Sequence, residues 1–337
     1  MAYVHGVFPL IYHTLKLHVE IIPVEVLKTM KLHNMDIVKK NMLMTAELIK
    51  VMKLLEENNI DAIAFKGPTL SQMAYEDITL RQYVDLDILI KKDDIYKVYD
   101  LLKNTHKRSL NLTKSQESTW FKYAHDLGLT SKNGIHIEFH WRMLDSDHPI
   151  NLKDINFFGS KSSHTINNYN ITTISNEEFL IYLCVHGSKH MFERIEWIVD
   201  IDKFIKTQSI NWDKFNNLLK GKNYQEFVYL GLYLSNSLFS TPLDKIDYSL
   251  SKEIEMVKSH IFNLWNQNIN FNNKNNMKYM LKLFNSKIDT IKYMHKIYLK
   301  PTFTEYWYID LPKQLYFLYY PIRQYLLMKK YFLDKNK

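Results

Sequence analysis

The sequence has few of the residues that mark several common protein classes. It has one cysteine, Cys184, among 337 residues, which excludes a disulfide scaffold and a cysteine-based zinc site. Eight glycines and eight prolines are too few for a turn-dense β-sandwich or a glycine-rich dinucleotide fold. No apolar run has the length of a membrane span, and residues 1–10 lack a cationic stretch followed by a long apolar one. We therefore expect a cytoplasmic protein with no membrane partner.

The sequence is rich in apolar residues and has more basic than acidic residues. Apolar residues make up 46% of the chain, enough for a substantial core in one large domain or two of ordinary size. Residues 203–337 contain 21 Lys and Arg against 10 Asp and Glu, whereas residues 1–202 contain 23 against 26. This asymmetry is compatible with an anionic partner for the C-terminal half. Because Lys, Asn, Ile and Tyr are abundant throughout, a compositional bias is the simpler explanation.

Hydrophobic periodicity divides the chain into a mixed first part and a helical second part. Asn133-Gly134 predicts a tight turn between two strands. Beyond residue 144 we expect an irregular stretch and then helices only. The predicted strands are 60–65, 84–90, 126–130 and 135–142. The predicted helices are 35–58, 69–75, 93–103, 175–191, 193–206, 212–219, 224–238, 250–264, 275–299 and 311–333.

Two aspartates at alternate positions of one predicted strand are the sharpest chemical feature. Residues 84–90 alternate with period two, which places Asp85 and Asp87 on the same face. Two carboxylates side by side are costly to bury unless a cation lies between them. Mg²⁺ is the natural cation, and paired ions about 3.5–4 Å apart serve in-line displacement at phosphorus. The alternatives are a solvated strand face or an aspartate that caps a neighbouring loop.

Basic residues and a glycine precede this strand. Lys66-Gly67 ends the predicted strand 60–65, and Arg81 lies just before Asp85. Glycine allows the backbone to approach a phosphate closely, and Lys66 and Arg81 can neutralise a triphosphate. We therefore predict nucleotide contacts for Lys66, Gly67 and Arg81.

Three ordered motifs give the chain a resemblance to a known family. The first combines Phe65–Leu70, Tyr75 and Leu80–Ile90, the second is Ile137–Arg142, and the third is Leu183–Asp200. Together they resemble the uncharacterised nucleotidyltransferase family of the DNA polymerase β-like superfamily, over about residues 35–205. Lys66-Gly67-Pro68 stands where the superfamily more usually has Gly-Ser, a variant that also occurs in related toxin and antitoxin nucleotidyltransferases.

The resemblance implies an α+β fold. A small mixed nucleotidyltransferase-type sheet with flanking helices would be followed by an all-helical domain. We predict an N-terminal helical segment at 1–34 and a catalytic domain at 35–150. A helical domain at 151–337 would then close the nucleotide cleft, with a basic C-terminal part.

The resemblance also implies a third metal-facing carboxylate, Glu138. With Asp85 and Asp87 it would hold Mg²⁺, or Mn²⁺ in its place; alternatively, Glu138 would act as a base on the acceptor hydroxyl. His140 is expected to orient Glu138 or to contact the nucleotide, the alternative being a structural histidine whose hydrogen bonds are satisfied. His136, Glu138 and His140 could alternatively form a zinc triad on one strand face. The paired aspartates favour an oxygen-only ion site instead.

The third motif supplies two further candidates, Lys189 and Asp200. Lys189 is expected to reach across the cleft to the β- or γ-phosphate, the alternative being a surface lysine paired with Glu193. Asp200 lies eleven residues beyond Lys189, so it returns to nearly the same helical face. It is a candidate for the nucleotide site, or a structural partner of Arg194 or Lys203.

These features predict a Mg²⁺-dependent nucleotidyltransferase. It would move an NMP from an NTP, ATP above all, to a hydroxyl of a small molecule or peptide and release pyrophosphate. A toxin-like enzyme acting on RNA such as tRNA is the first alternative, because the C-terminal half is basic and two sets of lysines recur every four residues in the region of the predicted helix 275–299. The other interpretation of these lysines is a solvated charged face. A non-catalytic nucleotide-binding sensor is the second alternative, although the intact carboxylates argue against it. The lysines are Lys274, Lys278 and Lys282, and Lys292, Lys296 and Lys300.

Overall fold

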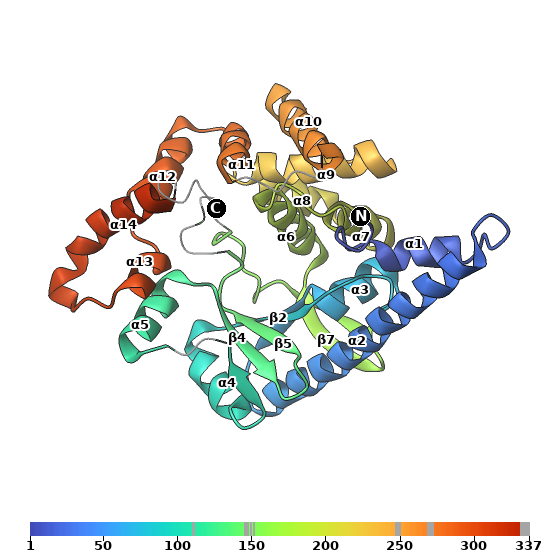
Figure 1. Ribbon diagram of the computed structural model, residues 1–337, viewed down its shortest axis with the longest axis horizontal. Coiled ribbons are helices and arrows are strands. Elements are labelled where there is room, and N and C mark those ends of the chain that lie inside the picture. The colour runs from blue at the N-terminus through green and yellow to red at the C-terminus, as the bar shows by residue number, and fades with distance from the viewer. Residues whose placement is uncertain are drawn as a thin grey trace.

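The computed structural model describes residues 1–109, 112–144, 148, 150, 152–246, 251–267 and 273–330. Its central feature is a five-stranded sheet with the order β1-β2-β5-β4-β3 (Figure 1). β2 and β5 are parallel and the other neighbours are antiparallel, so the sheet is mixed, as predicted. The strands are β1 (Ala62–Phe65), β2 (Asp85–Ile90), β3 (His106–Arg108), β4 (Asp126–Ser131) and β5 (His136–His140).

One face of the sheet is apolar and packs against the helices α2 (Val24–Glu57) and α4 (Ile95–Leu102). Alternation along β2 and β5 sends every second side chain to this face, where it is fully buried. Helix α2 is continuous through residues 34 and 35, so the predicted segment 1–34 shares this helix with the domain after it. The buried strand residues include Leu86, Ile88, Ile90, Ile137 and Phe139.

The other face of the sheet looks toward the helical part of the chain. Helix α3 (Gly67–Tyr75) packs against α7 (Glu196–Thr207), and both join a core that includes Phe65 and Leu89 of the sheet. This continuous core couples the two regions through apolar contact. The predicted helices after residue 175 are confirmed as α6 (Asn176–Lys189), α7, α8 (Trp212–Leu219), α9 (Gln225–Phe239) and α10 (Lys252–Gln267).

A β-hairpin corrects the prediction that residues 145–174 are irregular and that only helices follow. It consists of β6 (Lys161–Ile166) and β7 (Tyr169–Ile174), which pair antiparallel. Asn167 and Asn168 between them have φ of 47° and 62°, as a tight two-residue hairpin turn requires. The mostly polar β6 carries little hydrophobic alternation, so periodicity did not reveal it. β7 packs beside β1 and α2.

The last part of the chain, residues 273–330, forms a C-terminal arm. The predicted helix 275–299 is broken into α11 (Asn273–Met280) and α12 (Lys287–Tyr298), separated by a 3₁₀ turn and a Ser286 cap. Two more helices follow, α13 (Phe303–Tyr308) and α14 (Tyr319–Met328), and residues 331–333 of the predicted helix 311–333 lie outside the described range. Within the described residues, no helix is both long and apolar enough to cross a membrane.

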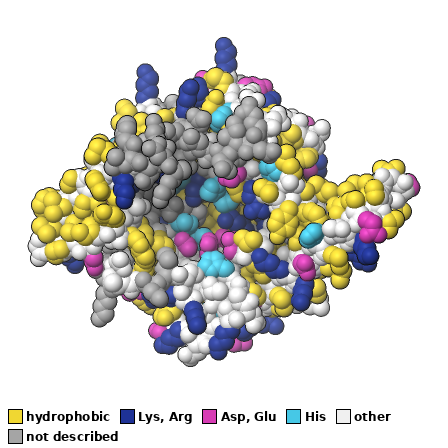
Figure 2. All heavy atoms as spheres, viewed as in Figure 1, with side chains coloured by type: hydrophobic (Ala, Val, Ile, Leu, Met, Phe, Trp, Pro, Cys, Tyr) yellow, Lys and Arg dark blue, Asp and Glu magenta, His cyan; other side chains and the backbone are white. Residues whose placement is uncertain are grey.

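The arm contacts the sheet region where its helix α13 packs against helix α5 (Lys114–Tyr123) (Figure 1). The ring centroids of Trp120 and Phe303 are 4.7 Å apart, and those of Tyr123 and Tyr306 are 5.5 Å apart. The arm therefore reaches back to the sheet region (Figure 1), and Figure 2 shows a hollow near the centre of this face of the molecule.

Candidate active site

The register of the parallel pair β2–β5 brings the predicted acidic residues together. Asp87 lies opposite Glu138, and Asp85 lies opposite His136. Alternate residues of a strand share a face, so these side chains leave the sheet on the side opposite its apolar face. Acidic and histidine side chains gather in the central hollow, with basic side chains near them (Figure 2). Two segments that are distant in the sequence thus form one polar cluster.

The junction between β1 and α3 adds a lysine and a glycine to this cluster. Lys66 has φ 56° and ψ −155°, a conformation that is otherwise almost confined to glycine. Gly67 has φ +43°, and a Cβ there would lie 3.2 Å from the Asp85 carbonyl oxygen. Glycine at this position lets the start of α3 approach β2 closely. The N-terminal N–H groups of α3 therefore begin beside Asp85, where an anion would be favoured.

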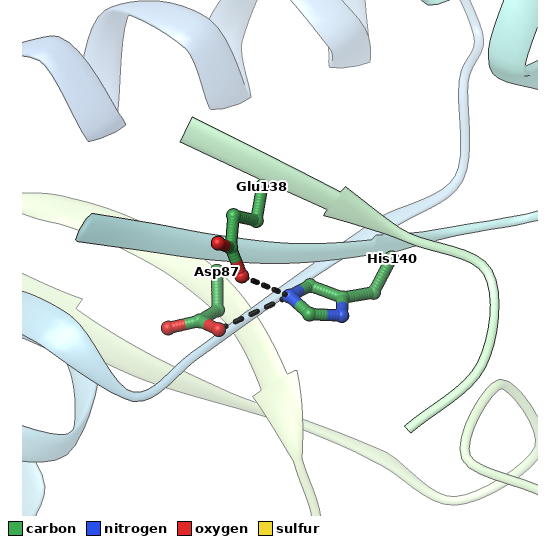
Figure 3. A group of neighbouring side chains, drawn as sticks. All are labelled: Asp87, Glu138 and His140. Carbon is green, nitrogen blue, oxygen red and sulfur yellow. Dashed lines mark hydrogen bonds and ion pairs between the residues drawn. The ribbon is translucent and has the colours of Figure 1, made fainter. Parts of the chain in front are cut away.

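Asp87 is the buried centre of the cluster (Figure 3). Its side chain is 1% exposed, and its Oδ1 accepts hydrogen bonds from Lys66 Nζ at 3.2 Å and from His140 Nε2 at 3.1 Å. The same His140 nitrogen lies 3.3 Å from Glu138 Oε2. Burial raises the pKa of Asp87, but the Lys66 charge and the His140 hydrogen bond outweigh it and lower that pKa. Burial lowers the pKa of His140, and its bonds to both carboxylates raise it to about 9.

These residues fit a divalent cation. One ligand atom each from Asp87, Glu138 and His140 lie within 4.8 Å of one another. Asp87 Oδ2 is buried, and no group in the described part of the chain hydrogen-bonds to it. A buried carboxylate oxygen without a partner is costly, and a cation would satisfy it. The set Asp85, Asp87 and Glu138 remains a prediction; in this cluster His140 takes the place expected for Asp85.

Asp85 and His136 lie at the edge of the cluster, and Asp85 is partly exposed. Burial and the charge of Asp87 both raise the pKa of Asp85. His136 Nε2 lies 3.6 Å from Glu138 Oε1. Hydrogen bonds from His136 and His140 lower the pKa of Glu138 well below its usual range. Glu138 is therefore a weak proton acceptor, which suits a cation ligand better than a general base.

Arg81 and Asp200 form a buried ion pair that joins the two regions. Arg81 Nε donates to Asp200 Oδ1 at 2.9 Å, and Nη2 donates to Oδ2 at 3.0 Å. Their side chains are 7% and 2% exposed, and the Tyr75 hydroxyl donates to Asp200 Oδ1 at 2.7 Å. The guanidinium is thus directed at a carboxylate on α7. Neither Arg194 nor Lys203, the partners considered from sequence, holds Asp200 in these contacts.

The buried Glu196 beside this pair gives a pH prediction. Burial raises its pKa from 4.5 to about 7, against the charges of Arg81 and Arg194. Folding therefore favours the protonated carboxyl, and this stabilising contribution is lost as the pH rises through about 7. We expect Glu196→Gln to stabilise the protein relative to the parent by about 2 kcal/mol at about pH 8.5, and very little at about pH 5. Denaturant unfolding at both pH values measures this, and an equal effect at both would contradict it.

Lys189 borders a cavity on the helical side of the structure. It ends α6 and lines this cavity of about 460 Å³ between α6 and the C-terminal arm, together with His190, Arg323 and Lys330. The predicted site residues therefore separate into three places. Lys66, Gly67 and His140 lie with the carboxylates, Arg81 lies with Asp200, and Lys189 lies in the cavity beside the arm.

Aromatic residues around the cluster were not predicted from the sequence. The Phe65 ring lies 5.2 Å from the His140 ring and 5.3 Å from the Tyr182 ring. The His125 ring lies 5.3 Å from His140 on the other side. Tyr182 is seven residues, about two helical turns, before Lys189 and therefore lies on the same face of the helix. This spacing could have identified it from the sequence. Nothing in the sequence pattern pointed to His125.

A further cavity of about 460 Å³ begins at the carboxyl ends of β2 and β5. Leu89, two residues along β2 from Asp87, is one of its lining residues, as is Trp141, which follows His140. The described residues between 141 and 158 supply most of its apolar wall, and Lys292 and Lys296 of α12 also line it. Its volume lies in the range of small-molecule sites.

Comparison with known proteins gives a family match and a similarity to a solved structure. A family described as "Uncharacterised nucleotidyltransferase" matches residues 1–240. No match is found among curated proteins. Among solved structures, the chain is similar to an antigenic nucleotidyltransferase-like protein from Paracoccidioides brasiliensis. That similarity has 13% identity and a TM-score of 0.39, and it covers 58% of this chain and 88% of the other. The family match spans the sheet, its carboxylates and helices α6 to α9, so the chain belongs to the uncharacterised nucleotidyltransferase family.

Proposed function

We propose that the protein transfers an NMP from an NTP, ATP being favoured, to a hydroxyl group. The observation that carries the proposal is the buried Asp87, which lies opposite Glu138 on a parallel strand pair. Its Oδ2 has no hydrogen-bond partner among the residues that the structure describes. In the reaction the acceptor oxygen forms a bond to the α-phosphorus, and the bond from that phosphorus to the pyrophosphate oxygen breaks. The hydroxyl proton passes to solvent, because Glu138 is a weak proton acceptor.

Asp85, Asp87 and Glu138 would hold Mg²⁺, or Mn²⁺ in its place, with His140 beside them. A bound divalent ion would neutralise phosphate charge and lower the pKa of the acceptor hydroxyl. Glu138, held ionised by its two histidine neighbours, fits the ligand role better than the base role. His140 holds both carboxylates in position through one nitrogen.

The phosphates would lie at the start of α3. The close approach of Gly67 to β2 and the N–H groups of the first turn favour an anion there. Lys66 supplies positive charge next to Asp87, and Lys189 would contact the triphosphate from the helical side. Because Arg81 and Asp200 are bonded to each other, we propose that they position α3 against α7 and do not touch the nucleotide.

The acceptor is proposed to be a small molecule or a peptide. The cavity at the ends of β2 and β5 is lined by Leu89, two residues along β2 from Asp87, and by a mixture of apolar and polar side chains. A site of this kind suits a compact acceptor. The lysines considered for RNA binding are divided between two surfaces. Lys278 and Lys282 border one cavity, whereas Lys292 and Lys296 border another. The side chain of Lys274 lies outside the described residues.

The test is transfer of label from NTPs to an unidentified acceptor. The protein is incubated with Mg²⁺, each α-labelled NTP in turn, and cell extract separated into small-molecule, peptide and RNA fractions. We expect label from ATP in the small-molecule or peptide fraction and none with Asp85→Asn. Label in RNA would promote the toxin-like alternative. Nucleotide binding without labelling of any fraction would contradict transfer and support a sensor.

A further inference from the structure

Lys66 occupies a cation position inside the carboxylate cluster. Its Nζ lies 3.2 Å from Asp87 Oδ1 and 5.8 and 5.5 Å from the centres of the Phe65 and Tyr182 rings. Its side chain is 18% exposed. A carboxylate on one side and two aromatic rings nearby provide the environment that stabilises a buried ammonium group.

The backbone keeps this ammonium in place. Lys66 has φ 56° and ψ −155°, a conformation that costs a non-glycine residue of order 1–3 kcal/mol. It lies between a strand whose four residues are all buried and a helix that starts at Gly67 against β2. Fixed elements on both sides leave the chain little freedom to withdraw Lys66. Such strain persists only where the surrounding structure imposes it.

Two divalent ions would have to share the oxygens of Asp87. Its Oδ1 already accepts from Lys66 and His140, whereas Oδ2 has no hydrogen-bond partner in the described part of the chain. Asp85, Asp87 and Glu138 together carry three negative charges when ionised. Lys66 already neutralises part of this charge, which lowers the demand for a second divalent ion.

We propose that the Lys66 ammonium permanently takes one of the two cation positions, so that the site binds a single divalent ion. This inference rests on the proposed function, in which the carboxylates bind a metal with the NTP. The ion would bind at Asp87 Oδ2 with Glu138. The lysine would provide, as a fixed part of the chain, the charge that a second ion supplies in paired-ion sites.

The experiment counts Mn²⁺ ions on the intact protein in complex with an α,β-methylene ATP analogue, which cannot transfer. Electron paramagnetic resonance separates a single Mn²⁺ from a spin-coupled pair about 3.5–4 Å apart. We expect one isolated ion per parent chain and a coupled pair in Lys66→Met. Lys66→Gly should also bind a pair; glycine relieves the strained conformation, which offsets part of the stability lost with the Lys66–Asp87 ion pair. If Lys66→Met does not fold, Lys66→Gly still provides the test.

Lys161→Met is the matched control, because it also removes a lysine that pairs with an aspartate. Lys161 Nζ lies 2.7 Å from Asp61 Oδ1, and this pair is outside the carboxylate cluster. It should keep one ion. A coupled pair in the parent, or a single ion in a folded Lys66 variant, would overturn the inference while leaving nucleotidyl transfer intact. The expected ion counts in a protein that labels no acceptor would refute the proposed function alone. No bound Mn²⁺ in any variant would overturn both.

Discussion

Asp85→Asn and Asp87→Asn are each expected to lower nucleotidyl transfer by on the order of 10³-fold, because each removes charge from the proposed metal site. Their effects on stability should differ. Asp87→Asn leaves the Lys66 ammonium buried without its carboxylate, and breaking such a pair costs about 3 kcal/mol. Asp85→Asn relieves repulsion from Asp87, whose charge helps to raise the pKa of Asp85, so stability should stay equal or increase.

Labelled-acceptor formation and denaturant unfolding of each variant measure the two effects. Asp61→Asn is the control, because Asp61 pairs with lysines at the surface, where ion pairs contribute little. It should keep both activity and stability. Transfer at the parental rate by Asp85→Asn would place the chemistry elsewhere. Equal stability losses in the Asp85 and Asp87 variants would contradict the different burial of the two aspartates.

Arg81→Ala is expected to destabilise the protein by about 3–5 kcal/mol, because it leaves Asp200 ionised and buried without its partner. Arg81→Met combined with Asp200→Leu should recover much of this loss, since replacing both members of a buried pair by apolar residues is often neutral. Recovery should be incomplete, because the Tyr75 hydroxyl then lacks its acceptor. A double-mutant cycle by denaturant unfolding gives the coupling energy.

Nucleotide affinity separates this structural role from the predicted nucleotide contact of Arg81. The double variant should bind the α,β-methylene ATP analogue nearly as tightly as the parent, because neither side chain is directed at the phosphates in our proposal. Lys206→Ala is the control, because it removes the exposed lysine of a neighbouring ion pair on α7, whose other member, Asp202, is buried. It should leave the affinity for the analogue unchanged. A folded double variant that has lost affinity for the analogue would restore the nucleotide-binding role of Arg81.

The sequence by itself determined the elements that carry the site. Period-two alternation in 84–90 and 135–142 identified two strands and the face on which Asp85, Asp87 and Glu138 lie. Lys66-Gly67 marked the end of a strand, and the family motifs identified the α+β fold. These signals are local, because a few consecutive residues decide backbone conformation and side-chain direction.

Tertiary structure decided which residues meet. Alternation cannot tell which strand pairs with which, so only the parallel register of β2 and β5 places Asp87 opposite Glu138 and brings His140 to both. Arg81 and Asp200 are 119 residues apart, and a lysine or arginine in sequence does not reveal whether it faces a phosphate or a carboxylate. The hairpin of β6 and β7 and the break in helix 275–299 likewise depend on long-range packing. Periodicity specifies a face of an element, whereas the partner of that face is chosen by contacts between distant parts of the chain.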